Sequence, residues 1–342
     1  MKTRILLKTV LTITGLPVLM ALIPVPVPAA PITLSYANFP PASTFPCVQM
    51  ERWVKEVEKR TSGQVKINTF PGSTLLAAKN IFDGVIAGTA DIGNFAMSYQ
   101  PGRFPVSEAV DLPLGLPSAR VASLVLYDLI DKVNPKEFEK VKILTFFTCP
   151  PADFMTSKPV RTLKDLKGME LRSSGTGADV VKNLGGIPIA MPQSETPEAL
   201  QKGIVKGNVS SLEVLKDMNY AAYCPYATDT SLFVVSFAVV MNKDKWNQLS
   251  ADVKKVMDGL RIEQAEWTGK YVDDHVADAL VWSKEKYGHQ VIQLSSADKA
   301  EITRLVKPML DSYIKRVSSQ GIPGAEIIAE VEKIRKKYEK RK

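Results

Sequence analysis

One arginine and the polar turn behind it form the most chemically suggestive pattern in the sequence. Residues 169–174 alternate as a strand, which places Arg172 on the face opposite the apolar side chains. Ser174 and Thr176 follow in a glycine-containing turn that leads into an amphipathic helix over residues 178–184. A guanidinium fork beside the free N–H groups of a helix N-terminus suits an anion. We therefore interpret these residues as an anion site, with a surface ion pair of Arg172 as the alternative.

The elements around this pattern alternate between strands and helices. From residue 32 to residue 93 the segments read strand, helix, strand, helix, strand. This order predicts an α/β fold with a largely parallel sheet and helices on both faces. Ligands on such sheets bind beyond the carboxyl ends of the strands. Four residues fall at these ends and are candidate ligand contacts: Asn38, Phe95, Ser98 and Tyr99.

Two later segments indicate how the chain is braced. Residues 233–241 are apolar and β-prone, which predicts a buried strand that returns to the first domain. Residues 250–288 contain no proline, which predicts one helix of roughly 55 Å. Such a helix is longer than one small domain and is expected to pack on both domains.

Aromatic residues near the strand ends predict an apolar wall for the ligand. Phe95, Tyr99, Phe147 and Phe154 occupy such positions. A wall of this kind favours an aromatic or branched acid over a small hydrophilic one. Packing in the core is the alternative for each ring.

The N-terminal segment is typical of an export signal. Lys2, Arg4 and Lys8 precede an apolar run, and small residues at Val27 and Ala29 offer a cleavage site. We predict a signal peptide over residues 1–29; a membrane anchor is the weaker alternative because prolines interrupt the run. The mature protein is then exported to the periplasm, and is soluble or peripheral to the membrane.

The net charge of the chain bears on the class of ligand. The formal net charge is +8, which suits a receptor for anions but also nucleic acid or anionic lipid. Much of the excess lies in the tail, residues 326–342, which has one apolar helical face and no interleaved aromatics of the kind that stack on bases. We read the tail as a solvated helix end and expect no nucleic-acid partner.

The sequence contains three cysteines, so at most one internal disulfide can form. Cys149 and Cys224 are the pair whose bridging we would test.

The sequence offers little for catalysis. His275 and His289 are the two histidines, and both lie in or after the long predicted helix. The run Asp273-Asp274-His275 places consecutive helical side chains in different directions, so a solvated face is expected rather than a metal site. No nucleophile elbow, phosphate loop or dinucleotide fingerprint is present in the sequence, and we expect no cofactor and no metal.

The order and spacing of several short motifs resemble the extracytoplasmic receptors of tripartite ATP-independent periplasmic (TRAP) transporters. The resemblance runs over residues 32–323 and is carried by Asp91-Ile92-Gly93, Pro101-Gly102-Arg103-Phe104-Pro105, Leu112-Pro113, Asp165-Leu166-Lys167-Gly168-Met169-Glu170-Leu171-Arg172, Ala199-Leu200-Gln201-Lys202-Gly203-Ile204-Val205-Lys206-Gly207 and Met241-Asn242-Lys243.

This resemblance implies a two-lobed fold that closes on an organic acid, with a long helix across both lobes. Lobe I is expected at residues 30–152 plus about 241–270, and lobe II at 153–240 plus about 271–325. The implied partners are a small organic anion and the TRAP membrane subunits. A receptor for a sensor or an ATP-driven transporter stays open as an alternative, as does a periplasmic enzyme.

The resemblance also assigns site residues. Arg172 matches the arginine that pairs the ligand carboxylate, and Asn38 matches a polar pocket residue. Ser210 falls near a position where many relatives carry an asparagine. Glu213, which ends the segment that begins at Met155, is a further candidate ligand contact. Asp153 lies near the place where sialic-acid-binding relatives carry a second arginine, which puts a second ligand carboxylate in doubt and indicates a hydroxyl or amine.

Overall fold

Two β-sheets organise the part of the chain that the structure, a computed structural model, describes, residues 31–340. The predicted signal peptide, residues 1–29, lies outside the described residues. The first sheet has the strand order β2 (Val65–Phe70), β1 (Ile32–Asn38), β3 (Ile92–Ala96), β10 (Ser236–Asn242) and β4 (Val141–Thr148). The second has the order β11 (Gln290–Gln293), β9 (Tyr226–Asp229), β5 (Asp153–Thr156), β8 (Gly207–Ser210), β6 (Glu170–Arg172) and β7 (Ile187–Ile189).

Each sheet contains one strand that runs against its neighbours. In the first sheet β1, β2 and β3 are parallel, as the sequence predicts, but β10 is antiparallel to both β3 and β4. In the second sheet β5 is antiparallel to β8 and β9. The chain passes from the first sheet into β5 of the second sheet, and later from the second sheet into β10 of the first. The predicted return of the chain to the first sheet is confirmed by β10.

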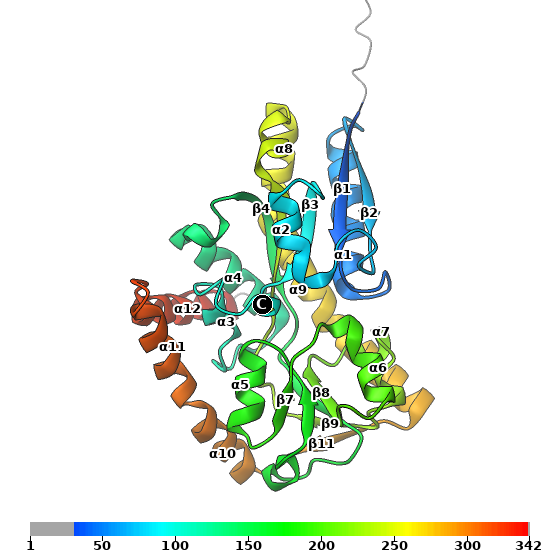
Figure 1. Cartoon of the computed structure of the whole chain (residues 1–342), viewed down its shortest axis with the longest axis vertical. Coiled ribbons are helices and arrows are strands. Elements are labelled where there is room, and N and C mark those ends of the chain that lie inside the picture. The colour runs from blue at the N-terminus through cyan, green and yellow to red at the C-terminus, as the bar shows by residue number, and fades with distance from the viewer. Residues whose placement is uncertain (1–30, 341–342) are drawn as a thin grey trace, which may run out of the picture. The chain divides into compact units, whose positions relative to one another are not determined.

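Helices cover both sheets (Figure 1). They are α1 (Phe45–Arg60), α2 (Ile81–Ile86), α3 (Glu108–Asp111), α4 (Ala119–Val133), α5 (Thr176–Asn183), α6 (Thr196–Gln201), α7 (Val214–Asp217), α8 (Lys243–Gln248), α9 (Ala251–Tyr287), α10 (Ser296–Val306), α11 (Pro308–Ser318) and α12 (Gly324–Glu339). The predicted long helix is confirmed as α9, which has 37 residues. It packs on α1, α4 and β4 from the first sheet and on α7 from the second. The α/β fold with a helix that braces both sheets is therefore as expected.

Two chain crossings lie side by side between the sheets. The first, residues 149–152, joins β4 to β5, and the second, residues 230–235, joins β9 to β10. Backbone hydrogen bonds link them: the Cys149 N–H donates to the Val235 carbonyl at 3.0 Å, and the Ala152 N–H donates to the Phe233 carbonyl at 2.7 Å. This pairing gives the connection between the sheets a defined geometry. The exact lobe boundaries stay a prediction.

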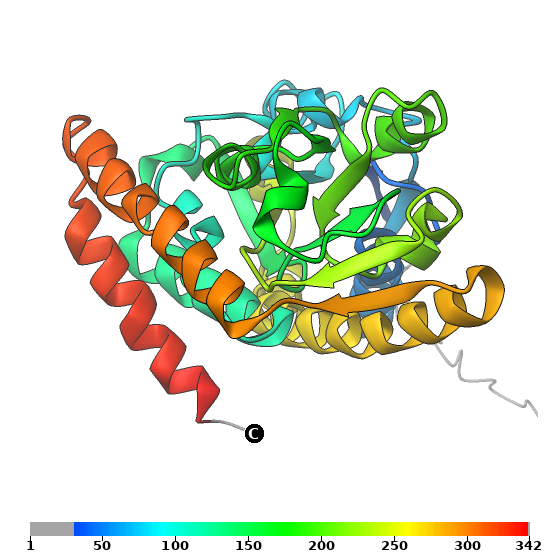
Figure 2. The same ribbon diagram turned by 90° about the horizontal axis from the view of Figure 1, so that it is seen from below.

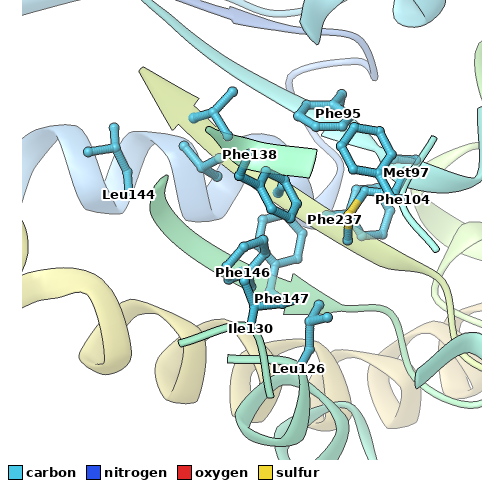
Figure 3. Close-up of a cluster of buried hydrophobic side chains, with 14 of the residues drawn as sticks. Phe95, Met97, Phe104, Leu126, Ile130, Phe138, Leu144, Phe146, Phe147 and Phe237 are labelled. Carbon is cyan, nitrogen blue, oxygen red and sulfur yellow. The ribbon is translucent and has the colours of Figure 1, made fainter. Parts of the chain in front are cut away.

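The first sheet has the larger hydrophobic core, which contains a group of packed phenylalanine rings (Figure 3). Phe95 packs against Phe82 and Phe104 with ring centroids 5.0 and 5.4 Å apart. Phe147 stacks on Phe237 at 4.9 Å. The second sheet has two smaller clusters, one of which contains Phe154. All three cysteines are buried free thiols, so the Cys149–Cys224 bridge is absent from the described residues.

The C-terminal helices run along one side of the molecule, from α10, which packs on α5 of the second sheet, to α12, which packs on α4 (Figure 2). The helical chain breaks before Pro308, because α10 ends at Val306 and α11 begins at Pro308. The apolar face of α12 is buried against α4, and its polar side is tied down by the Lys337–Asp128 ion pair at 2.6 Å. The tail is therefore more firmly packed than a solvated helix end. Among residues 31–340, the helices are too short or too polar to cross a membrane.

Candidate functional site

A cavity lies between the two sheets where strand ends from both converge. Its volume is about 50 Å³. Six predicted site residues line it: Ser98 and Tyr99 from the segment after β3, Arg172 and Ser174 at the end of β6, and Ser210 and Glu213 at the end of β8. The expected convergence beyond the carboxyl ends of parallel strands is therefore present for these residues.

The guanidinium of Arg172 is buried and held by neutral groups. The side chain is 5% exposed. Its Nε and Nη2 donate to the Met191 carbonyl at 3.0 and 2.7 Å, and Nη2 also contacts the Tyr99 hydroxyl at 3.3 Å. Nη1 has one long contact among the described residues, 3.4 Å to Oδ1 of Asn208. The carbonyl contacts fix the orientation of the fork and leave Nη1 donor capacity for a ligand.

No carboxylate neutralises Arg172 among residues 31–340. The ion pairs of this part of the chain involve other basic residues, and they lie mostly at the surface. A buried charge without a counterion is costly, so such a group implies an anionic partner. This is the strongest single indication of what the cavity binds.

Tyr99 connects the two sheets across the cavity. It belongs to a 3₁₀ turn after β3, Met97–Tyr99, yet its hydroxyl accepts hydrogen bonds from Arg172 and from the Gln193 N–H, the latter at 2.9 Å. The chain also approaches closely at Gly175, which has φ +57°, because a Cβ there would lie 2.8 Å from Cβ of Ser98. Glycine is therefore needed where the end of β6 meets the loop from the first sheet.

Four phenylalanines that the sequence analysis missed form the apolar wall: Phe39, Phe45, Phe233 and Phe237. Phe39 packs edge-on against Tyr99 at 5.4 Å, and Phe45 packs edge-on against Phe237 at 5.9 Å. Their positions were detectable in part. Phe39 directly follows the first strand, and Phe237 lies near the start of β10, the strand that returns to the first sheet. Periodicity alone does not show that these rings face a cavity rather than the core.

Three predicted aromatic contacts lie behind the wall rather than on it. Phe147 is fully buried and supports Phe45 and Phe237, which do line the cavity. Phe95 points into the phenylalanine cluster of the first core (Figure 3). Phe154 is buried in the core of the second sheet. For these rings the structure favours the alternative of core packing.

Three predicted polar contacts also lie outside the cavity lining. Asn38 is fully buried and donates to the Pro46 carbonyl at 2.8 Å, which ties β1 to the start of α1. Asp153 accepts the Thr230 and Ser231 N–H groups at 2.6 and 2.8 Å, so it braces the crossing between the sheets. Burial raises the pKa of Asp153 to about 6.

Thr176 lines a second, larger cavity of about 520 Å³, where Glu108 and Arg316 form an ion pair at 2.5 Å. The start of α5 therefore faces this second cavity, while Ser173 and Ser174 face the first. The anion site predicted from Arg172 and the helix N-terminus is divided between two cavities.

A second polar region of the first cavity surrounds Glu213. Its side chain is 2% exposed, and Oε1 accepts a hydrogen bond from the Ser211 hydroxyl at 2.7 Å. Burial, with a smaller contribution from Asp217, raises the pKa of Glu213 to about 7, although the Ser211 hydrogen bond and His275 lower it. The free thiol of Cys149 also lines the cavity, and burial raises its pKa to about 12, so it is a poor nucleophile.

His275 is a structural partner rather than part of a solvated face. Its Nε2 lies 2.7 Å from Oδ1 of Asp217, and both side chains are largely buried. The other Asp217 oxygen accepts the Phe45 N–H at 3.2 Å, which links α7, α9 and the start of α1. Asp273 caps α4 by accepting the Ala119 and Arg120 N–H groups. The prediction of a solvated face is wrong because α9 is packed on both sides here.

Several buried polar atoms around the cavity lack partners within the described residues. They include Oε2 of Glu213, Oε1 of Gln193 and Oγ of Ser173, all from lining residues. Most buried polar groups in proteins are hydrogen-bonded. Their clustering here indicates that an occupant of the cavity completes them.

Two sheets joined by paired crossings, with a polar and aromatic cavity between their strand ends, define a solute-binding receptor. The sequence model of the bacterial extracellular solute-binding proteins, family 7, matches residues 36–316. The chain therefore belongs to this family.

Solved structures place it among the TRAP receptors. A TRAP periplasmic solute-binding protein from Desulfovibrio salexigens is 52% identical, with 92% of this chain and 98% of that one covered and a TM-score of 0.82. A marine metagenome TRAP protein specific for aromatic acids, solved with 3-hydroxybenzoate, is 26% identical, with 91% and 100% covered and a TM-score of 0.87. The 2,3-diketo-L-gulonate-binding periplasmic protein of Escherichia coli is 25% identical, with 81% and 84% covered. The predicted TRAP receptor class and two-lobed fold are confirmed.

Proposed function

We propose that the protein captures a monocarboxylic acid through Arg172. The observation that carries this proposal is the buried guanidinium with neutral partners and without an ion pair among residues 31–340. A carboxylate at Nη1 would supply the missing negative charge and form charge-assisted hydrogen bonds. Ser174 and Tyr99, which already contact Nη2, would position the acid group.

The body of the ligand is expected to be aromatic or branched. Rings of Phe39, Phe45, Phe233 and Phe237 surround the space next to the polar groups. Such walls contribute through area removed from water and through edge-on ring contacts. The protein specific for aromatic acids noted above supports this choice.

Capture is proposed to occur by closure of the two lobes. Contacts between elements of the two sheets, from Tyr99 to Gln193 and from Phe45 to Asp217, would stabilise the closed form. A ligand that touches both sides shifts the equilibrium toward that form. We further propose that the closed receptor works in the periplasm and delivers the acid to TRAP membrane subunits, and that it has no catalytic activity.

The first test is a thermal-shift screen of the chain from residue 30 against organic acids that include benzoate. A ligand at 100-fold over its dissociation constant adds about 2.7 kcal/mol, a shift of a few degrees in Tm. The expected result is an acid that stabilises the parent and has no effect on Arg172→Ala. Equal shifts in both proteins would contradict the role of Arg172.

A matched control is Arg60→Ala. Arg60 is a half-exposed arginine that pairs with Glu56 and Glu263 away from the cavity. It loses the same charge, so a reduction of binding in this variant would indicate a net-charge effect rather than a site. Membrane delivery is tested separately, by uptake in vesicles that contain the TRAP membrane subunits with and without the receptor.

A further inference from the structure

Glu213 presents an unsatisfied oxygen at the cavity. Its side chain is 2% exposed and lines the cavity, and Oε1 is occupied by the Ser211 hydroxyl. Oε2 has no hydrogen-bond partner within residues 31–340. A buried carboxyl oxygen without a partner destabilises the protein, so a group of the bound solute is expected to complete it.

Glu213 and Arg172 line the same cavity, and each has its own set of polar contacts. Arg172 ends β6, in register with Asn208 of the adjacent parallel strand β8, whereas Glu213 lies beyond the end of β8. The polar contacts of Arg172 are Met191, Ser174, Tyr99 and Asn208. In the described chain, no hydrogen bond or ion pair joins the two side chains. A ligand can therefore contact both through different groups.

The walls that these two groups share are aromatic. Phe39, Phe45 and Phe237 line the same cavity, and Phe39 and Phe237 are stacked 5° from parallel. A flat ring suits such walls, because stacked and edge-on contacts are the favourable ring geometries. The cavity thus combines a cation, an apolar body and a separate hydrogen-bonding carboxyl.

We propose that Glu213 forms a hydrogen bond with a hydroxyl at the far end of the bound acid, so that the ligand is a hydroxylated aromatic monocarboxylate. The inference rests on the proposed function, because it takes Arg172 as the contact of the carboxylate. It makes Glu213 a specificity-determining residue, which separates acids that carry this hydroxyl from those that lack it.

The surroundings of Glu213 favour a hydroxyl over an ammonium group. The titratable groups that face it are Asp217 on α7, His275 on α9 and the Cys149 thiol at the crossing. Asp217 is already paired with His275. Since burial raises the pKa of Glu213 to about 7, the carboxyl is neutral for much of the time near neutral pH. A hydroxyl can donate to the ionised form and accept from the protonated one, whereas an ammonium needs the ionised form.

The test is isothermal titration calorimetry at pH 7 with benzoate, 3-hydroxybenzoate, 4-hydroxybenzoate and 4-(aminomethyl)benzoate. In the parent, the better hydroxybenzoate should bind about 10- to 100-fold more tightly than benzoate. In Glu213→Leu this ratio should fall to within roughly threefold of unity, and Glu213→Gln, which keeps the shape and one acceptor, should lie between. Thermal unfolding of each variant confirms that it is folded.

Glu137→Gln is the matched control. Burial also raises the pKa of Glu137 to about 7, but this residue accepts hydrogen bonds from Ser107 outside the cavity lining. It should leave the hydroxyl ratio unchanged. The inference alone is overturned if benzoate binds through Arg172 and neither hydroxybenzoate binds more tightly than benzoate. It is also overturned if 4-(aminomethyl)benzoate binds more tightly than the hydroxybenzoates. If none of the acids binds, the proposed function fails with it.

Discussion

The two polar ends of the cavity differ in how the protein treats a buried charge. Arg172 is oriented by neutral oxygens and has no ion pair among the described residues. Glu213 is placed where burial raises its pKa to about 7, with one oxygen bonded to Ser211 and one unsatisfied. The first end is a guanidinium cation, which forms charge-assisted hydrogen bonds with a carboxylate. The second end can give up its charge.

This difference predicts a division of labour. A fixed cation provides most of the affinity for any carboxylate, whereas a titratable carboxyl discriminates among acids that bind equally well at the first end. Substitutions at Arg172 should therefore abolish binding in general. Substitutions at Glu213 should change selectivity and the pH dependence of stability.

The largest effect is expected from a direct comparison of the two ends. Arg172→Ala should weaken benzoate binding by about 2–5 kcal/mol, or roughly 30- to 5,000-fold, because it removes one partner of a buried charge pair. Glu213→Ala should change benzoate affinity by less than about threefold, because benzoate lacks the distal hydroxyl. Titration calorimetry with both variants measures this contrast. Losses of similar size at the two positions would remove the proposed division.

The next effect concerns stability as a function of pH. The pKa of Glu213 is raised from 4.5 to about 7 in the folded protein, so the folded state favours the protonated form. The contribution of this protonation to the free energy of unfolding is fully present below pH 4.5. It is lost as the pH rises through 7, for a total of about 3 kcal/mol. Urea unfolding at pH 5 and pH 8 should show a smaller decrease in Glu213→Gln than in the parent. Glu137 and Asp153 also titrate in this range, so the difference between the proteins is the relevant quantity.

A smaller effect on stability is expected at the His275–Asp217 pair, which lies near Glu213. The hydrogen bond to Asp217 raises the pKa of His275, so this pair stabilises the fold below the unfolded pKa of about 6.5 and loses that contribution as pH rises through the folded pKa. His275→Gln should reduce stability at pH 5.5 by about 1–3 kcal/mol and have a smaller effect at pH 8.5. Equal losses at both pH values would indicate a packing effect instead.

The smallest effect tests how Arg172 is positioned. Tyr99→Phe removes the hydroxyl that accepts from Arg172 and from the Gln193 N–H but keeps the ring against Phe39. We expect benzoate affinity to fall by roughly 3- to 15-fold, corresponding to one net hydrogen bond. Unchanged affinity in calorimetry would show that the Met191 carbonyl alone orients the guanidinium.

The sequence predicted those parts of the site that depend on local pattern, but not those that depend on how distant segments pair. Strand alternation and the motif around it placed Arg172, and helical periodicity predicted α9. The antiparallel direction of β5 and β10 was not predicted, because pairing direction depends on chain crossings rather than on local pattern. Phe147 and Phe237 stack on each other, yet one backs the cavity and the other lines it. Local sequence does not distinguish these two positions, because both lie on buried strands of one sheet.

The most direct test of the central claim is a crystal structure of the chain from residue 30 with its best-binding hydroxybenzoate. The account predicts the carboxylate within hydrogen-bond distance of Nη1 of Arg172, the ring among Phe39, Phe45 and Phe237, and the hydroxyl on Oε2 of Glu213. A carboxylate bound away from Arg172, or an acid bound in the opposite direction, would contradict it.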